Sequence, residues 1–389
     1  MASNATPQIR PLMVGLFIGL PIAALLITPL WAWFVGFSGW QWLIAVVFLY
    51  LNGLSITGGY HRLWAHKAYK AHWSVRLWFA LWGAGALQNS VLVWASDHRR
   101  HHRNVDDNEK DPYSAGRGLW FSHIGWMLRD YQTNTEDFSN INDLMEDPIL
   151  AWQHKHYVAI TVIMNVVLPL AIGLVLGDVW GTLILVGLAR LVVNHNVTFF
   201  INSLAHYWGT RPYTEENSAR DNGFLAFLTY GEGYHNYHHI FQTDYRNGIR
   251  WWQWDPTKWM IFSLNKLGLA NDLVRVDEFK IQRAIMDTTF KRVRAKLDTD
   301  EMCPLRAAVE REYQAFLNCV KEWRELQAER YEKHREALGE AWNERRTKLV
   351  ERWDQTHMRD QLKVLEQSLH KQQKRLQIML EQLPSPQAA

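Results

Sequence analysis

The chain has 389 residues, of which 48% are hydrophobic and 21% are charged, and its formal net charge is +3. This near-neutral balance gives no reason to expect a nucleic-acid partner. The charges are unevenly spread: residues 11–60 contain no Asp, Glu, Lys or Arg, whereas charges of both signs are dense from about residue 275. We therefore expect a membrane-embedded part and a separate, charged C-terminal part.

The uncharged N-terminal stretch is long enough for two membrane-spanning helices, because one span needs about 20 apolar residues. We place the spans at Pro11–Phe37 and Gln41–Tyr60, with a turn at residues 36–39. The first apolar run is too long for a signal peptide and lacks a clear small-residue cleavage site, so we interpret it as a retained span.

The segment Trp73–Ala95 is apolar enough to suggest a further span. It carries Arg76, Gln88 and Asn89, so we expect a helix that lies in the membrane interface or bends back on itself. The alternative, a plain fifth transmembrane helix, would put the histidines on its two sides on opposite faces of the membrane.

A second helical hairpin is predicted at Tyr157–Gly177 and Val179–Ile201. Lys and Arg gather outside the two hairpins, while both connecting turns are nearly free of charge. The positive-inside rule then puts both termini and all the histidine clusters in the cytoplasm. We expect a multi-pass integral protein of a bacterial inner membrane.

Eight histidines stand in three clusters beside these spans: His61 and His66; His98, His101 and His102; His235, His238 and His239. The i, i+3, i+4 spacing of the last two clusters puts three rings on one helical face. The first pair is about 140° apart on an α-helix, so we expect the helix to end or bend near Gly58-Gly59. Imidazole is a common transition-metal ligand, and eight exceed the about four ligands of a tetrahedral site. The clusters predict two metal ions.

A narrow polar stripe follows the fourth predicted span at His195, Thr198, Asn202 and His206. Ionisable residues within a span are costly and usually face a functional interior. His206, at the cytoplasmic end, is placed to complete the ligand set, with Asn202 one turn behind it. We interpret His195, which lies deeper, as a satisfied core histidine.

Metal-bound imidazoles usually donate their second N–H to a carboxylate or carbonyl. Asp97 directly precedes His98, and Glu232 lies three residues before His235. Both are candidate partners of ligating histidines, with surface ion pairs as the alternative.

The C-terminal tail is rich in Glu, Lys, Arg, Gln and Leu, and contains Cys303 and Cys319, which we expect to be reduced, structural thiols. Apolar residues recur there with heptad spacing, at Leu362, Leu369, Leu376 and Leu383, with Leu365 and Met379 between them. We expect either a coil that oligomerises or docks an electron donor, or a helical hairpin that packs on the domain or the membrane surface.

Together these patterns predict an all-α integral membrane protein with four transmembrane helices, a cytoplasmic helical domain carrying a dimetal site, and a helical tail. The expected parts are a cytoplasmic N-terminus (1–10), hairpin 1 (11–60), a region with the first two histidine clusters (61–156), hairpin 2 (157–206), a region with the third cluster (207–275) and the tail (276–389).

The three clusters resemble the histidine boxes of membrane fatty acyl desaturases, in the acyl-CoA Δ9 (stearoyl-CoA) branch. The patterns HxxxxH, HxxHH and HxxHH stand at residues 61–66, 98–102 and 235–239. The resemblance extends to further segments and covers roughly residues 10–270 but not the tail; these segments are Gly231–His239, Asn202–His206, Arg117–Gly118, Phe121–Trp126 and Asp244–Gly248.

The resemblance implies that nine histidines hold two irons and that Asn202 reaches one iron through water. By position the nine are His61, His66, His98, His101, His102, His206, His235, His238 and His239. It implies O2-dependent insertion of a cis double bond, at Δ9, into a saturated long-chain acyl thioester, acyl-CoA, with no catalytic residue apart from the metal ligands. Spacing alone does not select iron, and protein made in another host can carry zinc instead.

The resemblance also implies a narrow apolar tunnel that bends the acyl chain at the metals, with Trp94 and Thr198 as candidate wall residues. Eukaryotic relatives carry an Arg where this chain has Ser96, and a basic run where it has Leu128-Arg129-Asp130. A phosphate-rich headgroup can still meet other cations, at Arg99, Arg100, Arg103 and Arg129. CoA, acyl carrier protein and phospholipid all remain open as the carrier.

The sequence contains no haem-binding His-Pro-Gly-Gly motif, so we expect a separate electron donor, such as ferredoxin or cytochrome b5 with its reductase. A diiron membrane alkane or lipid hydroxylase is the first alternative, since it shares the metal chemistry but usually has different box spacings. A metal transporter is the second, but it needs ligands near the bilayer midplane. The boxes here lie at one end of the predicted spans.

Overall fold

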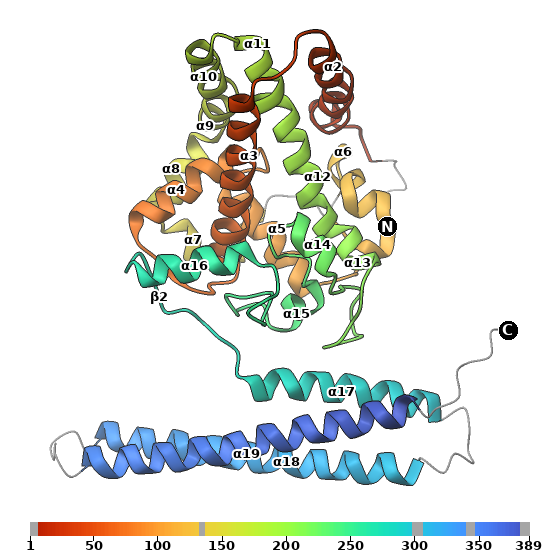
Figure 1. The fold of residues 1–389 in the computed structure, drawn as a ribbon, viewed down its shortest axis with the longest axis vertical. Coiled ribbons are helices and arrows are strands. Elements are labelled where there is room, and N and C mark those ends of the chain that lie inside the picture. The colour runs from red at the N-terminus through yellow and green to blue at the C-terminus, as the bar shows by residue number, and fades with distance from the viewer. Residues whose placement is uncertain (1–6, 132–136, 298–305, 340–346, 382–389) are drawn as a thin grey trace. The chain divides into compact units, whose positions relative to one another are not determined.

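The computed structural model describes residues 7–131, 137–297, 306–339 and 347–381. This part of the chain is mostly helical (Figure 1). It forms two compact units, of which the first comprises residues up to 211 with 215–275, and the second comprises 212–214 with the residues from 276 onward.

Four helical stretches of the first unit are long and apolar enough to cross a membrane: Pro11–Phe34, Gly39–Ala65, Tyr157–Leu176 and Val179–Tyr207. The first span consists of α1 (Pro11–Val14), the π-helical η1 (Gly15–Gly19) and α2 (Leu20–Phe34), and the second of α3 (Gly39–Leu54) and the π-helical η2 (Ser55–Ala65). The third consists of α9 (Tyr157–Val162), the π-helical η6 (Ile163–Val167) and α10 (Leu168–Leu176). The fourth consists of α11 (Val179–Thr182), the π-helical η7 (Leu183–Ala189), α12 (Arg190–Asn202) and α13 (Leu204–Tyr207). The prediction of an all-α fold with four spans is confirmed. The second and fourth spans run further than predicted, and so contain His61 and His206.

The two hairpin turns lie side by side and are tied to each other. Ser38 caps α3 through a reciprocal pair of hydrogen bonds with Gln41, and Gly177 ends α10 with a left-handed φ of 77°. The Gln41 side chain also donates to Asp178 Oδ2 at 2.9 Å and to Thr182 Oγ1 at 3.2 Å in the other hairpin. The turns therefore lie at the same end of the four helices.

The segment Trp73–Ala95 is not a continuous helix. It is divided between α4 (Trp73–Ala84) and α5 (Val91–Arg103) by a turn in which Leu87 and Asn89 have φ values of 53° and 72°. Among the described residues it is not a candidate span. The prediction that this segment is not a fifth span is confirmed.

Three side chains of α12 form hydrogen bonds with this turn and fix its position. Arg190 donates to the Gly85 carbonyl at 3.1 Å, His195 Nε2 lies 2.9 Å from the Ala86 carbonyl oxygen, and Thr198 Oγ1 accepts from Gln88 at 2.9 Å. The segment between α4 and α5 thus contacts α12 at three points along the helix. His195 is a satisfied core histidine, as its depth predicted.

Shorter elements join and cover the spans. They are the strand β1 (Lys70–Ala71), η3 (Ala115–Arg117), η4 (Phe121–Gly125), α6 (Trp126–Leu128), α7 (Asn142–Met145), α8 (Pro148–Lys155), α14 (Gly223–Leu228), α15 (His235–Ile240), α16 (Pro256–Lys266) and the strand β2 (Ala270–Asn271). β1 pairs with β2 in antiparallel register, which links the segment after η2 to the segment after α16.

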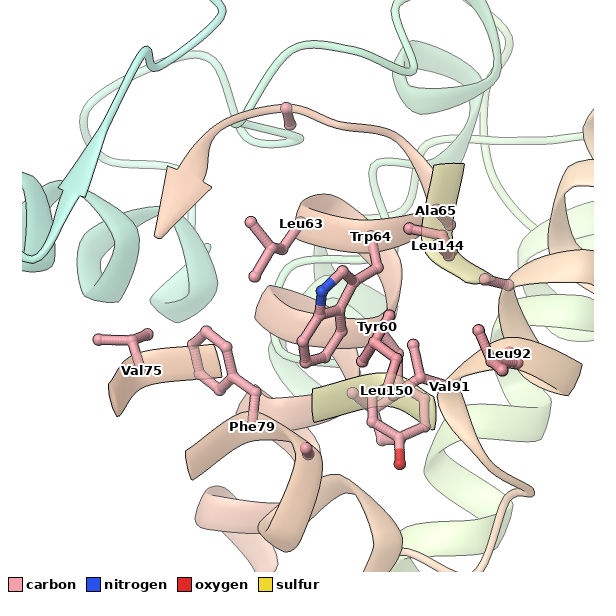
Figure 2. Packing of buried hydrophobic residues seen from close by; sticks show 14 of the residues in the cluster. Tyr60, Leu63, Trp64, Ala65, Val75, Phe79, Val91, Leu92, Leu144 and Leu150 are labelled. Carbon is pink, nitrogen blue, oxygen red and sulfur yellow. The ribbon is translucent and has the colours of Figure 1, made fainter. Parts of the chain in front are cut away.

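The largest hydrophobic cluster surrounds η2. Figure 2 shows Tyr60 and Trp64 of η2 at its centre, with Phe79 of α4 on one side and Leu92 of α5 on the other. Burial of such apolar area stabilises the fold by roughly 25 cal/mol per Å². The cluster therefore fixes η2, which carries the first histidine box, against α4 and against α5, which carries the second.

The second unit is a bundle of α17 (Glu278–Leu297), α18 (Arg306–Gly339) and α19 (Thr347–Glu381). Leu365, Leu369 and Leu376 of the heptad row are buried in its core, next to the free thiol of Cys319. The row is therefore covered by helices of the same chain, and oligomerisation through it stays a prediction. The other expected positions, Leu383, Cys303 and the side chain of Met379, lie outside the described residues.

Candidate metal centre

The structure brings all nine predicted histidines together in two adjacent groups. One group contains five and the other four, and the ligand nitrogens within each group lie within 4.8 Å of one another: His61, His66, His98, His102 and His238; His101, His206, His235 and His239. The rings of His102 and His239, one from each group, are stacked with centroids 4.4 Å apart. The arrangement offers two ligand sets side by side.

The first box reaches this cluster through a widened helix. We expected the helix to end or bend at Gly58-Gly59, and this was wrong, because η2 continues through both glycines to Ala65. The His66 amide donates to the His61 carbonyl, five residues back, at 3.1 Å. A π-helical turn brings residues i and i+5 onto one side, so the two rings converge without a break.

The second and third boxes each contribute to both groups. On α5, His98 and His102 belong to the five-histidine group and His101 to the four-histidine group. On α15 the division is reversed, since His235 and His239 belong to the four-histidine group and His238 to the other. In each box the i, i+4 pair stays together on one helical face, and the residue between them turns to the neighbouring group.

The Nε2 atoms of the histidines converge at distances that suit metal ligation. His66 and His98 approach at 2.8 Å, His61 and His102 each approach His238 at 3.0 Å, and His235 lies 3.1 Å from His206 and 3.0 Å from His239. Two imidazoles at right angles on one ion, each with a bond of about 2.1 Å, would have nitrogens about 3 Å apart. The residues present therefore fit a pair of metal ions.

The ligating nitrogens are fixed by partners on the other side of the rings. His101 Nδ1 meets both Asp111 oxygens at 2.9 Å, and His98 Nδ1 lies 3.2 Å from the Tyr113 hydroxyl. His206 Nδ1 lies 2.8 Å from Ser218 Oγ, which itself contacts Asp106 at 2.6 Å. Such contacts leave a lone pair on Nε2 directed at the centre. These partners could not be predicted from the sequence, because no spacing rule connects them to the boxes.

Burial favours the neutral form, which a metal needs, for six of these histidines. Desolvation first, and second the repulsion that the neighbouring histidines would exert on a second positive charge, hold the pKa values well below the usual 6.5 for His66, His98, His102, His235, His238 and His239. Where both rings carry their proton on Nδ1, two Nε2 lone pairs face one another at 3.0 Å and repel, and a cation between them would remove this repulsion.

Glu232 connects this cluster to a buried ion network. Its Oε2 lies 2.9 Å from His61 Nδ1, and its Oε1 accepts from Arg62 at 2.8 Å. Arg62 is 1% exposed and also contacts Asp255 at 3.0 Å. Burial by itself would raise the pKa of Glu232, but the charge of Arg62 and the His61 contact outweigh it and lower the pKa to about 2. Glu232 is therefore a permanent anion behind His61.

Two other predicted residues lie differently. The Asp97 carboxylate pairs with Arg100 one turn along α5, which is the ion-pair alternative. Asn202 ends α12, immediately before the kink at Ser203 that leads to His206, and its side chain lines a cavity that reaches the metal centre.

That cavity has a volume of about 660 Å³ and runs between the spans to the centre. Its walls are mainly apolar and include His61 and His98 at the metal end and both predicted wall residues, Trp94 and Thr198. The Trp94 ring stacks on His98 with centroids 4.8 Å apart. Gln88, which the sequence analysis did not select as a wall residue, lines the cavity beside Thr198. A mainly apolar pocket with a few polar groups suits a long apolar ligand.

The four predicted headgroup arginines do not line the described cavity, whereas Arg10 does. Arg99 is occupied inside the protein, where it donates to the carbonyls of Trp64 and Ala65 and to Asp143. Arg100 pairs with Asp97, Arg129 donates to the Pro7 carbonyl, and Arg103 is exposed on α5. Ser96 is buried and bonded to Asn140, so it presents no charge there.

Fold and site together define a class: a four-span helical membrane protein with histidines arranged for two metal ions. The profile of the fatty acid desaturase family matches residues 38–266. The chain therefore belongs to the fatty acid desaturase family and is an integral membrane protein.

Individual relatives agree with this family. The chain is 42% identical over 275 residues to acyl-CoA desaturase 1 of Saccharomyces cerevisiae, covering 69% of this chain and 54% of the relative. It is 41% identical over 283 residues to a probable acyl-CoA desaturase of Schizosaccharomyces pombe, covering 72% and 58%. It is 37% identical over 237 residues to stearoyl-CoA desaturase 5 of Bos taurus, covering 60% and 70%. The match thus spans just over half the length of the two yeast relatives.

Proposed function

We propose that the protein is an O2-dependent desaturase that inserts a cis double bond, at Δ9, into a saturated long-chain acyl thioester, with acyl-CoA as the substrate. The observation that carries this proposal is the apolar cavity whose inner wall contains His61 and His98 of the metal centre. A methylene deep in such a cavity would lie next to the metals and away from bulk water. The names of the relatives, acyl-CoA and stearoyl-CoA desaturases, support the same substrate class.

We propose iron as the resident metal, held by the five-histidine and the four-histidine groups, with Asn202 contributing through water. A bound iron pair would supply the O2 chemistry that removes hydrogen from an unactivated methylene, for which no side chain suffices. The chain's own residues bind and orient. Glu232 and Asp111 hold His61 and His101 in place, and Trp94, Gln88 and Thr198 shape the cavity beside the centre.

The carrier headgroup is proposed to bind at the outer end of the cavity, near Arg10. This residue directly precedes the first span and lines the cavity. Its segment is held by Arg129 and by the hydrogen bond from the Arg10 amide to the Leu128 carbonyl at 2.9 Å. A guanidinium in this position suits a phosphate-bearing group.

Electrons are proposed to come from a separate donor, a ferredoxin or a cytochrome b5 with its reductase. Both termini and the metal centre are proposed to face the cytoplasm, because Lys and Arg gather at that end of the spans. The relatives come from yeasts and animals, so they lend no support to the expected bacterial inner membrane.

Expression in a host that lacks such an enzyme tests the proposal. We expect a new cis alkene at carbon 9 of long saturated chains, located by mass spectrometry, and we expect its loss in His238→Ala. An alcohol in place of the alkene would favour a membrane hydroxylase. Loss of metal uptake in His238→Ala with an unchanged lipid profile would favour a transporter.

A further inference from the structure

The region that follows the fourth span presents a row of exposed aromatic side chains. We call them the aromatic rim: Phe224, Phe227, Trp251, Trp252, Trp259 and Phe262, which are 40–84% exposed. Trp254 joins the two helices of the rim, since its ring lies 5.1 Å from Phe227 of α14 and 5.3 Å from Trp259 of α16. Exposed rings of this size and number need a partner, because contiguous apolar surface in water is costly.

The charges of this region are sorted by sign. Residues 222–271 contain three carboxylates, Glu232, Asp244 and Asp255, and all three are buried. The exposed charges of the same residues are cations, Arg250 and Lys266. Lys266 lies over the Phe262 ring, 5.3 Å from its centroid. Asp272, directly after β2, is an exposed carboxylate, but it pairs with Lys70 at 2.8 Å. A surface of aromatic rings and cations whose nearest exposed carboxylate is paired is complementary to anionic lipid headgroups.

The depth of the rim is set by its contacts with the second span. At 1.5 Å per residue from Gly39, Leu49 lies about 15 Å and Thr57 about 27 Å along the helix, within a hydrocarbon core of about 30 Å. The Tyr230 hydroxyl, two residues after α14, donates to the Leu49 carbonyl at 3.2 Å. Thr257 of α16 contacts Thr57 at 2.6 Å. The α16 contact therefore lies near the far boundary of the hydrocarbon core, whereas the Tyr230 side chain reaches along the span towards the middle of the core.

Figure 1 shows α16 lying crosswise at the end of α3, and not parallel to it. This is the orientation of a helix in the membrane interface. We propose that the aromatic rim docks on the lipid bilayer, with its rings at the boundary of acyl chains and headgroups and with Arg250 and Lys266 against anionic headgroups. The third histidine box, which lies between α14 and α16, is thereby held at the membrane surface.

Depth-dependent fluorescence quenching tests this proposal. Single cysteines replace Trp251 or Trp259 in the full chain carrying Cys303→Ser, and are labelled with an environment-sensitive dye in lipid nanodiscs. The parent without an added cysteine corrects for any labelling of Cys319. We expect a nitroxide on the upper acyl chain to quench both rim positions roughly threefold more than the exposed control positions Lys110 and Glu146.

The cations give a second readout. Arg250→Glu with Lys266→Glu should reduce lipid quenching at position 259 in discs with anionic lipid, whereas Lys110→Glu with Lys155→Glu should not. Quenching at the rim by aqueous iodide, equal to that of the control positions, would overturn the proposal. So would protection from both quenchers, because another protein surface would then cover the rim. Neither readout depends on the acyl chemistry of the metal centre.

Discussion

At the scale of single residues, carboxylates outside the two histidine groups contact the candidate metal centre. Glu232 and Asp111 meet the Nδ1 atoms of His61 and His101 at 2.9 Å and so fix which ring nitrogen faces the centre. Glu232 is itself held by Arg62 and Asn247. A shift of either carboxylate would move the histidine ring that it contacts, and would also move the neighbouring rings, because the rings contact one another.

Glu232→Gln should weaken metal binding without unfolding the protein. The amide keeps the shape but removes the anion behind His61, and loss of such a partner typically costs 10- to 100-fold in metal affinity or activity. Metal content by mass spectrometry and alkene formation measure the effect. Glu146→Gln, at an exposed position, is the matched control and should retain full metal content.

The lowered pKa of Asp143 makes the stability of the fold depend on pH. Its bidentate contact with Arg99, at 2.7 and 3.0 Å, outweighs partial burial and, with Lys67, lowers the pKa of Asp143 to about 2. Because the folded pKa lies below the unfolded value of about 3.9, this stabilisation is present above pH 4 and is lost as the pH falls towards 2.

Asp143→Asn should therefore lower the melting temperature modestly at neutral pH, and by less as the pH falls from 4 to 2. Thermal unfolding in detergent over that range measures the difference. An unchanged difference at both ends of the range would contradict this assignment.

At the scale of elements, two local features shape the site. The π-helical η2 lets box one use an i, i+5 pair, which an α-helix would point apart. The turn between α4 and α5 is fixed by hydrogen bonds to α12. Two residues of this turn with left-handed φ, Leu87 and Asn89, form part of the cavity wall. The left-handed residues of the turn place strained backbone next to the proposed reaction, as expected where shape matters more than local preference.

Arg190→Met should destabilise the α4–α5 turn. Arg190 is buried in the fourth span and donates to Asn52 and Asn165 at 2.7 Å and to the Gly85 carbonyl. Removing it leaves these groups unpaired, at a cost of about 3 kcal/mol or more in total. Thermal unfolding in detergent measures the loss, and Lys155→Met, an exposed cation at the end of α8, should be neutral.

At the scale of the whole molecule, the chain consists of two units with separate cores. All nine histidines and the cavity belong to the first unit. The second unit has its own core, centred on buried residues such as Phe290 and Leu369. We therefore expect damage to one core to leave the other intact.

Leu369→Glu in the full chain tests this separation. A buried charge in the bundle core should expose α17–α19 to limited proteolysis, because an unpaired charge is strongly unfavourable there. The metal content per chain should stay unchanged. Val364→Glu, on the exposed face of the same helix, should alter neither property, and loss of metal in Leu369→Glu would show that the units depend on each other.

The sequence by itself determined the four spans, the exclusion of Trp73–Ala95 as a fifth span, the nine histidines and the separate tail, because hydropathy over 20 residues and the spacing of boxes are local properties. Only the tertiary structure decided how the boxes divide between two groups, that η2 is π-helical, and that Arg99 serves internal contacts. It also supplied Asp111, Gln88 and Arg10. These depend on segments far apart in the chain meeting in one place, and no spacing along a single segment records that meeting.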